Sequence, residues 1–358
     1  MTLHLCLLTL ALTSCMSSDT SGQSTGAPAA SHPAAASPNW VAATGKAIWT
    51  IFQDSKGNNW FGSDGYGVYR YDGKIILHFG TKQGLAGDRV REVKEDNAGN
   101  IYINTLGGIS KWDGRSLTTL APDSSTDAVW RLDPDDLWFT TPQELGGVYR
   151  YDGKTLYHLK FPASPLEAGF RRSSPLVPFS LYGVYSIVKD SRGAIWFGTS
   201  TFGACRYDGT AHAWLYEPEL SLIPGGGSIG IRGILEESPG RFWISNDRQR
   251  FVVAATDSVA NGFHYIRYTK EAGTSDVRST GATYYQTVLK DKAGDIWMQT
   301  YSAGVFRYNR KTMAHYPVRS GAATVPVVTM YQDRRGVIWL GTAGDGVYNF
   351  NGKRFVHF

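Results

Sequence analysis

The chain has 358 residues, of which 13% are aromatic and 19% charged, with 41 Gly and 11 Trp. This composition is typical of many short strands joined by glycine turns and argues against a long helix. The formal net charge is +5 and the 36 Lys and Arg residues are scattered, so a nucleic-acid-binding function is disfavoured.

The N-terminus is typical of a secreted protein. Residues 3–14 form an apolar stretch that is too short to span a membrane and lies where a secretory signal lies. Its end, Leu12-Thr13-Ser14-Cys15, resembles the lipobox of bacterial lipoproteins, which implies lipidation of Cys15. The segment before it lacks Lys and Arg, which departs from that pattern. An ordinary signal peptide that contains a Cys is therefore the alternative.

The next segment is small and polar, so residues 15–38 are predicted to form the lipidated Cys15 and a disordered tether. The expected domains are then a signal peptide over 1–14, this tether, and a folded domain over 39–358. The expected location is the bacterial cell envelope, with contact to the membrane through the lipid anchor only.

A sequence unit recurs seven times after the tether, and this repetition decides the fold. Each unit holds four short hydrophobic segments separated by turn residues, which predicts four antiparallel strands. Seven such units predict an all-β, seven-bladed β-propeller of four-stranded blades. The seven units span 48–79, 90–120, 129–159, 184–216, 231–268, 285–316 and 327–358.

Acidic residues and glycines mark the turns inside each unit. The first turn runs from an Asp to a Gly, as in Asp54–Gly57, where the carboxylate caps the turn and the glycine takes a positive φ. Asp-Gly pairs such as Asp72-Gly73 form the last turn. Calcium binding by these turns is the alternative, but the EF-hand ligand spacing is absent. No cofactor or metal is predicted.

A large ring recurs at one position of the second strand, which predicts that it packs between neighbouring blades. These residues are Trp60, Tyr102, Trp138, Trp196, Trp243, Trp297 and Trp339. Cys205, the one Cys of the predicted domain, takes the position that Tyr69 and Tyr149 hold in other units. It is therefore predicted to be a buried structural thiol rather than a nucleophile.

The unit resembles the two-component regulator propeller repeat. Residues 193–199 (Gly-Ala-Ile-Trp-Phe-Gly-Thr) and 336–347 carry the family pattern almost without departure, and the resemblance extends from about Ala47 to Phe358. The third unit departs at Asp133-Pro134-Asp135-Asp136, where the turn glycine is missing, and the fifth departs over 246–250. The resemblance implies seven blades, and we expect the first blade to pack on the seventh without an exchanged strand.

The long connections of the chain are predicted to lie on one face of the propeller. In a propeller, the loops from the second to the third strand and from the fourth strand to the next blade share a face. The long connections, 160–181 and 216–230, both belong to that face. Loops this long are usually functional or disordered.

The candidate site lies where the first strands begin, at the channel mouth on the same face. Arg side chains bind anions and aromatic rings stack on apolar faces, so this mixture suits a glycan, an aromatic small molecule or a carboxylate. The alternative is that the rings only fill space between blades. The predicted ligand-binding residues are Trp49, Arg91, Trp130, Tyr185, Arg232 and Gln286, with Val328 at the seventh position. Loop residues predicted to complete the rim are Tyr66, Phe202, Arg248 and Tyr301, together with Asp247, Arg250 and Asp345.

Catalysis is the rival interpretation, because the virginiamycin B lyase propellers share the blade pattern and use a histidine base with acidic metal ligands. Here His78, His158, His212, His264, His315 and His357 are all predicted to lie in solvent-facing positions of fourth strands. A polysaccharide or streptogramin-type lyase or hydrolase would then depend on carboxylates such as Glu92, Glu144 or Asp247, for which no partner is evident. We therefore expect a non-catalytic module that binds a glycan, a small molecule or an envelope protein, and the resemblance implies a link to extracellular sensing of sugars or polysaccharide fragments.

Overall fold

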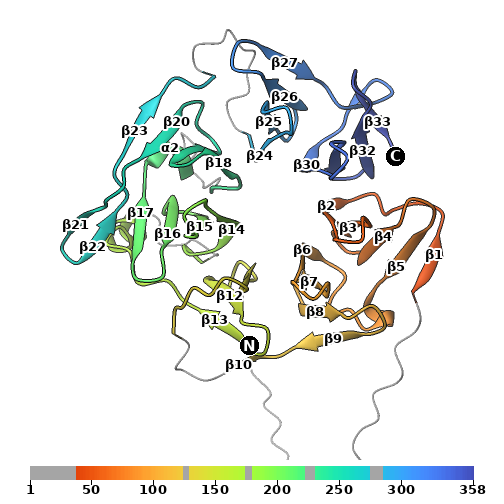
Figure 1. The fold of residues 1–358 in the computed structure, drawn as a ribbon, viewed down its shortest axis with the longest axis horizontal. Coiled ribbons are helices and arrows are strands. Elements are labelled where there is room, and N and C mark those ends of the chain that lie inside the picture. Colours follow the sequence, from red (N-terminus) through yellow and green to blue (C-terminus); the bar gives the residue numbers. More distant parts are fainter. Residues whose placement is uncertain (1–37, 124–128, 174–179, 222–229, 275–284) are drawn as a thin grey trace, which may run out of the picture. The chain divides into compact units, whose positions relative to one another are not determined.

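Seven sheets of four to six strands each form a ring of blades around a central opening (Figure 1). The computed structural model describes residues 38–123, 129–173, 180–221, 230–274 and 285–358. The innermost strand of each blade contacts those of both neighbouring blades, and contacts between β2 and β30 close the ring. The predicted seven-bladed propeller is therefore confirmed. The signal peptide, Cys15 and nearly all of the predicted tether lie outside the described residues.

The strands of each blade are consecutive in the sequence, from blade 1 to blade 4 as follows. Blade 1 holds β1 (Asn39–Val41), β2 (Ile48–Gln53), β3 (Asn59–Ser63), β4 (Val68–Tyr71) and β5 (Ile76–Phe79), and the 3-10 turn η1 (Thr81–Gln83) follows. Blade 2 holds β6 (Val90–Glu95), β7 (Ile101–Thr105), β8 (Gly108–Trp112) and β9 (Leu117–Leu120). Blade 3 holds β10 (Pro122–Asp123), β11 (Leu137–Thr140), β12 (Val148–Tyr151) and β13 (Leu156–Leu159), and α1 (Glu167–Ser173) follows. Blade 4 holds β14 (Val184–Lys189), β15 (Ile195–Thr199), β16 (Ala204–Tyr207) and β17 (His212–Leu215), and α2 (Pro218–Ser221) follows.

The remaining blades complete the ring. Blade 5 holds β18 (Ile234–Ser238), β19 (Arg241–Ile244), β20 (Arg250–Val253) and β23 (Tyr268–Glu271), with the inserted strands β21 (Ser258–Ala260) and β22 (Phe263–Tyr265). Blade 6 holds β24 (Thr287–Lys290), β25 (Ile296–Gln299), β26 (Val305–Tyr308) and β27 (Met313–Tyr316), and β28 (Arg319–Ser320) and β29 (Ala323–Thr324) form a hairpin after it. Blade 7 holds β30 (Val327–Gln332), β31 (Ile338–Thr342), β32 (Val347–Phe350) and β33 (Phe355–His357). No helix of the described ranges is long and apolar enough to cross a membrane.

The first turn of each regular blade is held by its acidic residue. In blade 1, Asp54 Oδ1 accepts hydrogen bonds from the main-chain N–H groups of Lys56 (3.0 Å) and Asn58 (2.8 Å), and Gly57 has a φ of 88°. Its second oxygen accepts a hydrogen bond from Trp60 Nε1 at 2.8 Å. The predicted Asp cap therefore also binds the predicted blade-packing residue, which ties the turn to the core.

The recurrent rings pack between blades, as predicted. Trp60 lies in a core with Val90, Val93 and Ile103 of the next blade. Trp196 packs against Phe242 of blade 5 with ring centroids 4.5 Å apart. Cys205 is fully buried, and burial raises the pKa of its thiol, which fits the predicted structural role.

Blade 1 packs directly on blade 7, without an exchanged strand. β33 pairs with β32 of its own blade, and Phe61 of blade 1 lies 5.8 Å from Trp339 and 5.9 Å from Phe358 between ring centroids. This confirms the expected closure. The segment before β2 adds β1 to the outer edge of β5, a fifth strand that was not predicted.

Blade 3 departs from the prediction, because its predicted first strand around Trp130 is not formed in the described residues. β11 is the innermost strand of this sheet, and β10 extends its outer edge in parallel with β13. Side chains from blade 2 bind the inner edge of β11 instead: Glu92 accepts hydrogen bonds from Thr140 N (2.7 Å), and Lys94 Nζ donates to the Trp138 carbonyl. These side chains satisfy main-chain groups that a first strand would have paired.

Blade 5 contains a hairpin that was not predicted. β21 and β22 pair with each other, and β22 runs parallel to β17, so this hairpin extends the sheet of blade 4. Arg206 of blade 4 forms an ion pair of 2.6 Å with Asp257 next to the hairpin. The prediction that His264 lies in the fourth strand of blade 5 is therefore wrong, because His264 belongs to β22.

Candidate ligand-binding face

The predicted loops share a face of the ring. The main-chain N–H groups of Gly65 and Gly67, in the loop from β3 to β4, donate to the Asp88 carbonyl in the connection to blade 2, at 3.0 and 2.8 Å. The same contact recurs between Gly147 and Tyr182, at 3.1 Å. Each first strand begins at this face, so residues at its start lie near the mouth of the channel.

The first group at the mouth combines a ring and a guanidinium. Arg91, near the start of β6, lies over the ring of Trp49 of β2, with its Cζ 5.2 Å from the ring centroid. Trp49 is 38% exposed, so part of it is accessible from solvent. Asp64 Oδ1 lies 3.7 Å from Arg91 and 3.9 Å from Arg89, which partly balances the two cations.

A second group of the same kind comes from blades 4 and 5. The Cζ of Arg232 lies 4.2 Å from the ring centroid of Tyr185, a short cation–π contact. The Tyr185 hydroxyl accepts a hydrogen bond from Gln143 Nε2 at 2.5 Å, and the Arg232 main chain donates to Ser245 Oγ at 3.0 Å. The Tyr185 ring is thus held by a residue of blade 3, and the main chain of Arg232 is fixed within blade 5.

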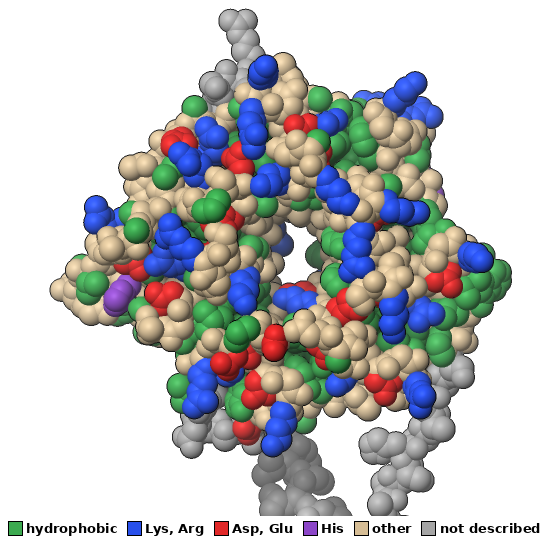
Figure 2. Space-filling view, in the orientation of Figure 1, with side chains coloured by type: hydrophobic (Ala, Val, Ile, Leu, Met, Phe, Trp, Pro, Cys, Tyr) green, Lys and Arg blue, Asp and Glu red, His purple; other side chains and the backbone are tan. Residues whose placement is uncertain are grey.

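The two groups act on each other electrostatically. Burial lowers the pKa of Arg91, Asp64 raises it, and repulsion from Arg89 and Arg232 lowers it again. The guanidinium stays protonated at neutral pH because its ordinary pKa is far above 7. Figure 2 shows Lys and Arg side chains around and inside the opening on the face in view. The channel therefore has positive charge that an anionic group could neutralise.

Two predicted residues are taken up by packing within the fold. Trp130 donates from Nε1 to the Lys160 carbonyl at 3.0 Å and packs against Trp138 and His212, with ring centroids 5.6 and 4.3 Å away. Its prediction is wrong because blade 3 forms no first strand there. Phe202 is 1% exposed and packs against Phe170 of α1, so it cannot contact a ligand at the surface.

The other predicted residues lie on the rim or near it. Tyr66 is 63% and Tyr301 49% exposed, each in a loop from a second to a third strand. Gln286 is half-buried and its N–H donates to the Gln299 carbonyl at 2.8 Å. Arg248 is half-buried, and its carbonyl accepts a hydrogen bond from Thr274 N.

Sequence reasoning missed two apolar residues of the rim. Leu106 is 40% and Leu145 45% exposed, in the loops that correspond to those of Tyr66 and Tyr301. Their positions next to the loop glycines could have revealed them. With them, four blades present an exposed apolar side chain on this face.

The histidines have structural roles. The Nε2 atoms of His78, His158 and His315 lie 2.6, 2.9 and 2.5 Å from the carbonyl twelve residues earlier, so they carry the proton and donate to it. His212 does lie in the fourth strand, but the prediction that it faces solvent is wrong. It stacks on Tyr207 at 4.7 Å, and burial lowers its pKa to about 4.

Two of the three carboxylates considered for catalysis have partners. Burial raises the pKa of Glu92, but Lys94 and hydrogen bonds from Thr140 and Asn104 outweigh burial, so the pKa is lowered overall. Asp247 forms an ion pair of 2.7 Å with Lys270. Both carboxylates thus stabilise the fold, and the expectation that they have no partner is corrected.

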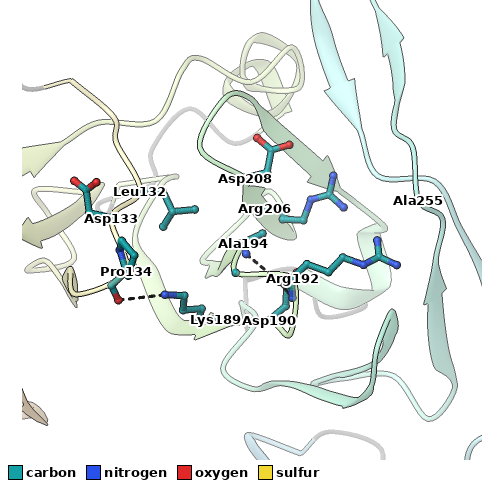
Figure 3. A pocket seen from close by; sticks show the side chains of 11 residues that line it. Leu132, Asp133, Pro134, Lys189, Asp190, Arg192, Ala194, Arg206, Asp208 and Ala255 are labelled. Carbon is teal, nitrogen blue, oxygen red and sulfur yellow. Dashed lines mark hydrogen bonds between the residues drawn. The ribbon is translucent and has the colours of Figure 1, made fainter. Parts of the chain in front are cut away.

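A separate cavity of about 380 Å³ lies beside the first turn of blade 4 (Figure 3). Its wall includes Leu132, Pro134 and Arg206. Lys189 Nζ donates to the Pro134 carbonyl at 3.3 Å, which holds the irregular segment of blade 3 against blade 4. The cavity lies beside a first turn and therefore away from the predicted face.

Comparison with known proteins agrees with this geometry. Residues 178–201 and 321–344 match the family model of the two component regulator propeller. The chain therefore carries two component regulator propeller repeats within its seven-bladed propeller. No curated protein matches the chain.

The propeller is similar to several solved structures. The extracellular domain of a hybrid two component system from B. thetaiotaomicron matches at 16% identity and a TM-score of 0.58, over 86% of this chain and 40% of that one. Virginiamycin B lyase from Staphylococcus aureus matches at 14% identity and a TM-score of 0.60, over 87% and 97%. PorZ from Porphyromonas gingivalis matches at 17% identity and a TM-score of 0.55, over 85% and 46%. At these identities the similarity shows the fold, and this propeller spans less than half the length of that extracellular domain and of PorZ.

Proposed function

We propose that this propeller is a non-catalytic recognition module that binds an anionic glycan or small molecule at the channel mouth. The observation that carries the proposal is the pair of guanidinium–ring contacts, Arg91 over Trp49 and Arg232 over Tyr185. A guanidinium binds a carboxylate through paired hydrogen bonds, and an open indole face packs against a sugar or an aromatic ring. One carboxylate, Asp64, lies in contact with this group.

A binding screen tests this proposal. The full-length chain is screened against acidic and neutral glycans and aromatic acids, and each hit is measured again with Trp49→Ala and Arg91→Ala. Loss of a desolvated charged contact should weaken binding about tenfold or more. Arg115→Ala is the matched control, because Arg115 lies in the last turn of blade 2 on the opposite face. Hits that ignore both changes would contradict the proposal.

A protein partner is the second candidate. The exposed side chains of Tyr66, Leu106, Leu145 and Tyr301 form an apolar rim that a small ligand would not cover. Such a rim suits a scaffold or a sensor that passes ligand binding on to another envelope protein. A partner that is captured by the native chain and lost with Tyr66→Ser and Tyr301→Ser would favour this candidate.

A lyase has less support. A catalytically inactive His-to-Ala variant of virginiamycin B lyase has been solved with quinupristin. In the described residues of this propeller, every histidine lies in an outer strand or in the β21–β22 hairpin, and none lies in a first strand. Metal-dependent turnover of a streptogramin or a polysaccharide would favour the lyase instead.

The proposed location is the cell envelope, with the propeller anchored through a lipid on Cys15. The support is the lipobox-like Leu12-Thr13-Ser14-Cys15 after an apolar stretch. The test is metabolic labelling with a palmitate analogue. Label in the native chain, and its loss in Cys15→Ser, are expected, whereas an unlabelled, soluble secreted form would contradict the anchor.

A further inference from the structure

A groove of about 780 Å³ lies between the outer strands of blades 6 and 7, away from the channel mouth. All of β33 lines one side, and the end of β27 and the β28 turn line the other. The twelve lining residues include Arg319, Lys353 and Arg354, together with His315 and His357. None of the twelve is Asp or Glu.

The cations of this groove are not neutralised within the fold. In the described part of the chain, no carboxylate forms an ion pair with Arg319, Lys353 or Arg354, and all three are exposed. Arg206 and Arg307, by contrast, form ion pairs of 2.6 Å with an Asp of their own or a nearby blade. The groove therefore presents uncompensated positive charge, which favours an anionic occupant.

The groove also has an open strand edge. β33 pairs with β32, and in the described residues no strand pairs with its other edge. The main-chain N–H of Phe358 donates to the Val347 carbonyl. Along an antiparallel strand, the main-chain N–H and C=O groups of successive residues point alternately toward the paired strand and away from it. The main-chain groups of Phe355 and His357 therefore point away from β32 and are available to another strand.

The same chain shows that such edges accept strands. β1 pairs with β5 on the outer edge of blade 1, and β22 pairs with β17 on the outer edge of blade 4. β5 and β17 hold the position in their blades that β33 holds in blade 7. The edge of a propeller blade is thus a geometry that an extended segment can join.

The aromatic rings of the groove disfavour a sugar. Tyr348 is 2% and Phe355 7% exposed, and the ring of Tyr316 stacks on Trp297 at 5.5 Å. Two of these rings are therefore buried, and one face of the third is taken by Trp297. An acidic glycan could use the charges of the groove but not its strand edge.

We propose that this groove binds an extended acidic peptide of a partner protein, which pairs with β33 as a fifth strand of blade 7. Its acidic side chains lie against Arg319, Lys353 and Arg354, and its main chain bonds to Phe355 and His357. This surface is separate from the channel mouth, so the two sites can be occupied together.

The test uses the full-length chain and a fluorescent peptide in which Glu alternates with Val and Thr, with anisotropy as the readout. Charge reversals Arg319→Glu, Lys353→Glu and Arg354→Glu should each weaken binding several-fold, and together about a hundredfold. Lys74→Glu is the matched control, because Lys74 holds the position of Lys353 in blade 1, where β1 already covers the edge. Binding that is lost equally with Lys74→Glu would overturn the proposal.

A second probe separates strand pairing from charge alone. The same peptide with alternate main-chain nitrogens methylated keeps its charge but loses the N–H groups that a strand needs. It should bind at least about tenfold more weakly to the native chain. Equal binding of the methylated peptide, or binding of polygalacturonate in place of the peptide with the same sensitivity to the three reversals, would overturn the proposal.

Discussion

At the scale of single residues, one hydrogen bond recurs around the ring and joins a turn to the core. The indole N–H of Trp60, Trp196, Trp243, Trp297 and Trp339 donates to the acid six residues earlier, at 2.7–3.0 Å. The hydroxyl of Tyr102 does the same in blade 2, at 2.9 Å. Blade 3 has Leu132 at the position of the acid, and Trp138 Nε1 has no hydrogen-bond partner.

This difference gives a matched pair of substitutions. Trp196→Phe and Trp138→Phe remove the same atoms from buried sites, but only the first leaves a buried carboxylate oxygen, that of Asp190, without its donor. Trp196→Phe should therefore lower the free energy of unfolding by about 1–2 kcal/mol more than Trp138→Phe. Urea unfolding measures both. Equal losses would mean that the recurrent acid only shapes the turn.

A second prediction at this scale concerns pH. Burial lowers the pKa of His212 to about 4 in the folded chain, whereas the ordinary value is 6.5. The unfolded chain therefore binds the proton first as pH falls, and stability is lost between about pH 6.5 and 4. The loss should be about 1–3 kcal/mol and should be much smaller in His212→Phe. Trp138→Phe, in the same cluster, should keep the pH slope, and an unchanged slope in His212→Phe would contradict the account.

At the scale of elements, the inner edge of blade 3 shows how a fold tolerates a missing strand. β11 has no first strand beside it in the described residues, and Glu92 and Lys94 of β6 bind its Thr140 N–H and Trp138 carbonyl. Glu92 also accepts a hydrogen bond from Asn104 at 2.8 Å. One carboxylate thus satisfies several buried donors that would otherwise be unpaired.

Glu92→Leu should therefore destabilise the chain by about 2–4 kcal/mol at neutral pH, because it leaves those donors buried without an acceptor. Glu95→Leu is the control, since Glu95 lies on the same strand and bonds to the exposed turn residue Ser55. Its cost should be clearly smaller. Amide hydrogen exchange should also show faster exchange at Thr140 in the Glu92 variant, and unchanged exchange there would contradict the role of this carboxylate.

The elements also show what a sequence can and cannot predict. The Asp-to-Gly turns and the recurrent rings are local or strictly periodic, so the blades and their number follow from them. The loss of the first strand in blade 3 depends on Glu92 and Lys94 of another blade, which no local pattern reveals. His264 was misplaced because Phe263–Tyr265 repeats the aromatic-His pattern of fourth strands, although β22 pairs with blade 4.

The contrast between regular repeats and contacts from other blades also explains which site residues could be predicted. The sequence placed Trp49, Arg91, Tyr185 and Arg232 at the start of first strands, and Arg91 does contact Trp49 and Arg232 does contact Tyr185, because the repeat is regular in their blades. Trp130 was placed in the same way, but its strand is not formed in the described residues. Phe202 was predicted from its loop, and it is buried against Phe170 of α1.

At the scale of the whole propeller, the two faces of the ring carry different structural features. The turns that hold the acid–ring bonds face one way, and the variable loops, the long connections and both guanidinium–ring groups face the other. The contacts that hold the blades and the proposed binding surface therefore lie on different faces, so loop residues can change without loss of the blade cores.

The most direct measurement is a crystal structure of the chain with its best acidic ligand from the screen. We predict that the anionic group of the ligand lies between the guanidinium groups of Arg91 and Arg232, with a ring or sugar face against Trp49. A ligand bound on the opposite face, or in the cavity beside Leu132 and Arg206, with the channel mouth empty, would contradict the proposed function.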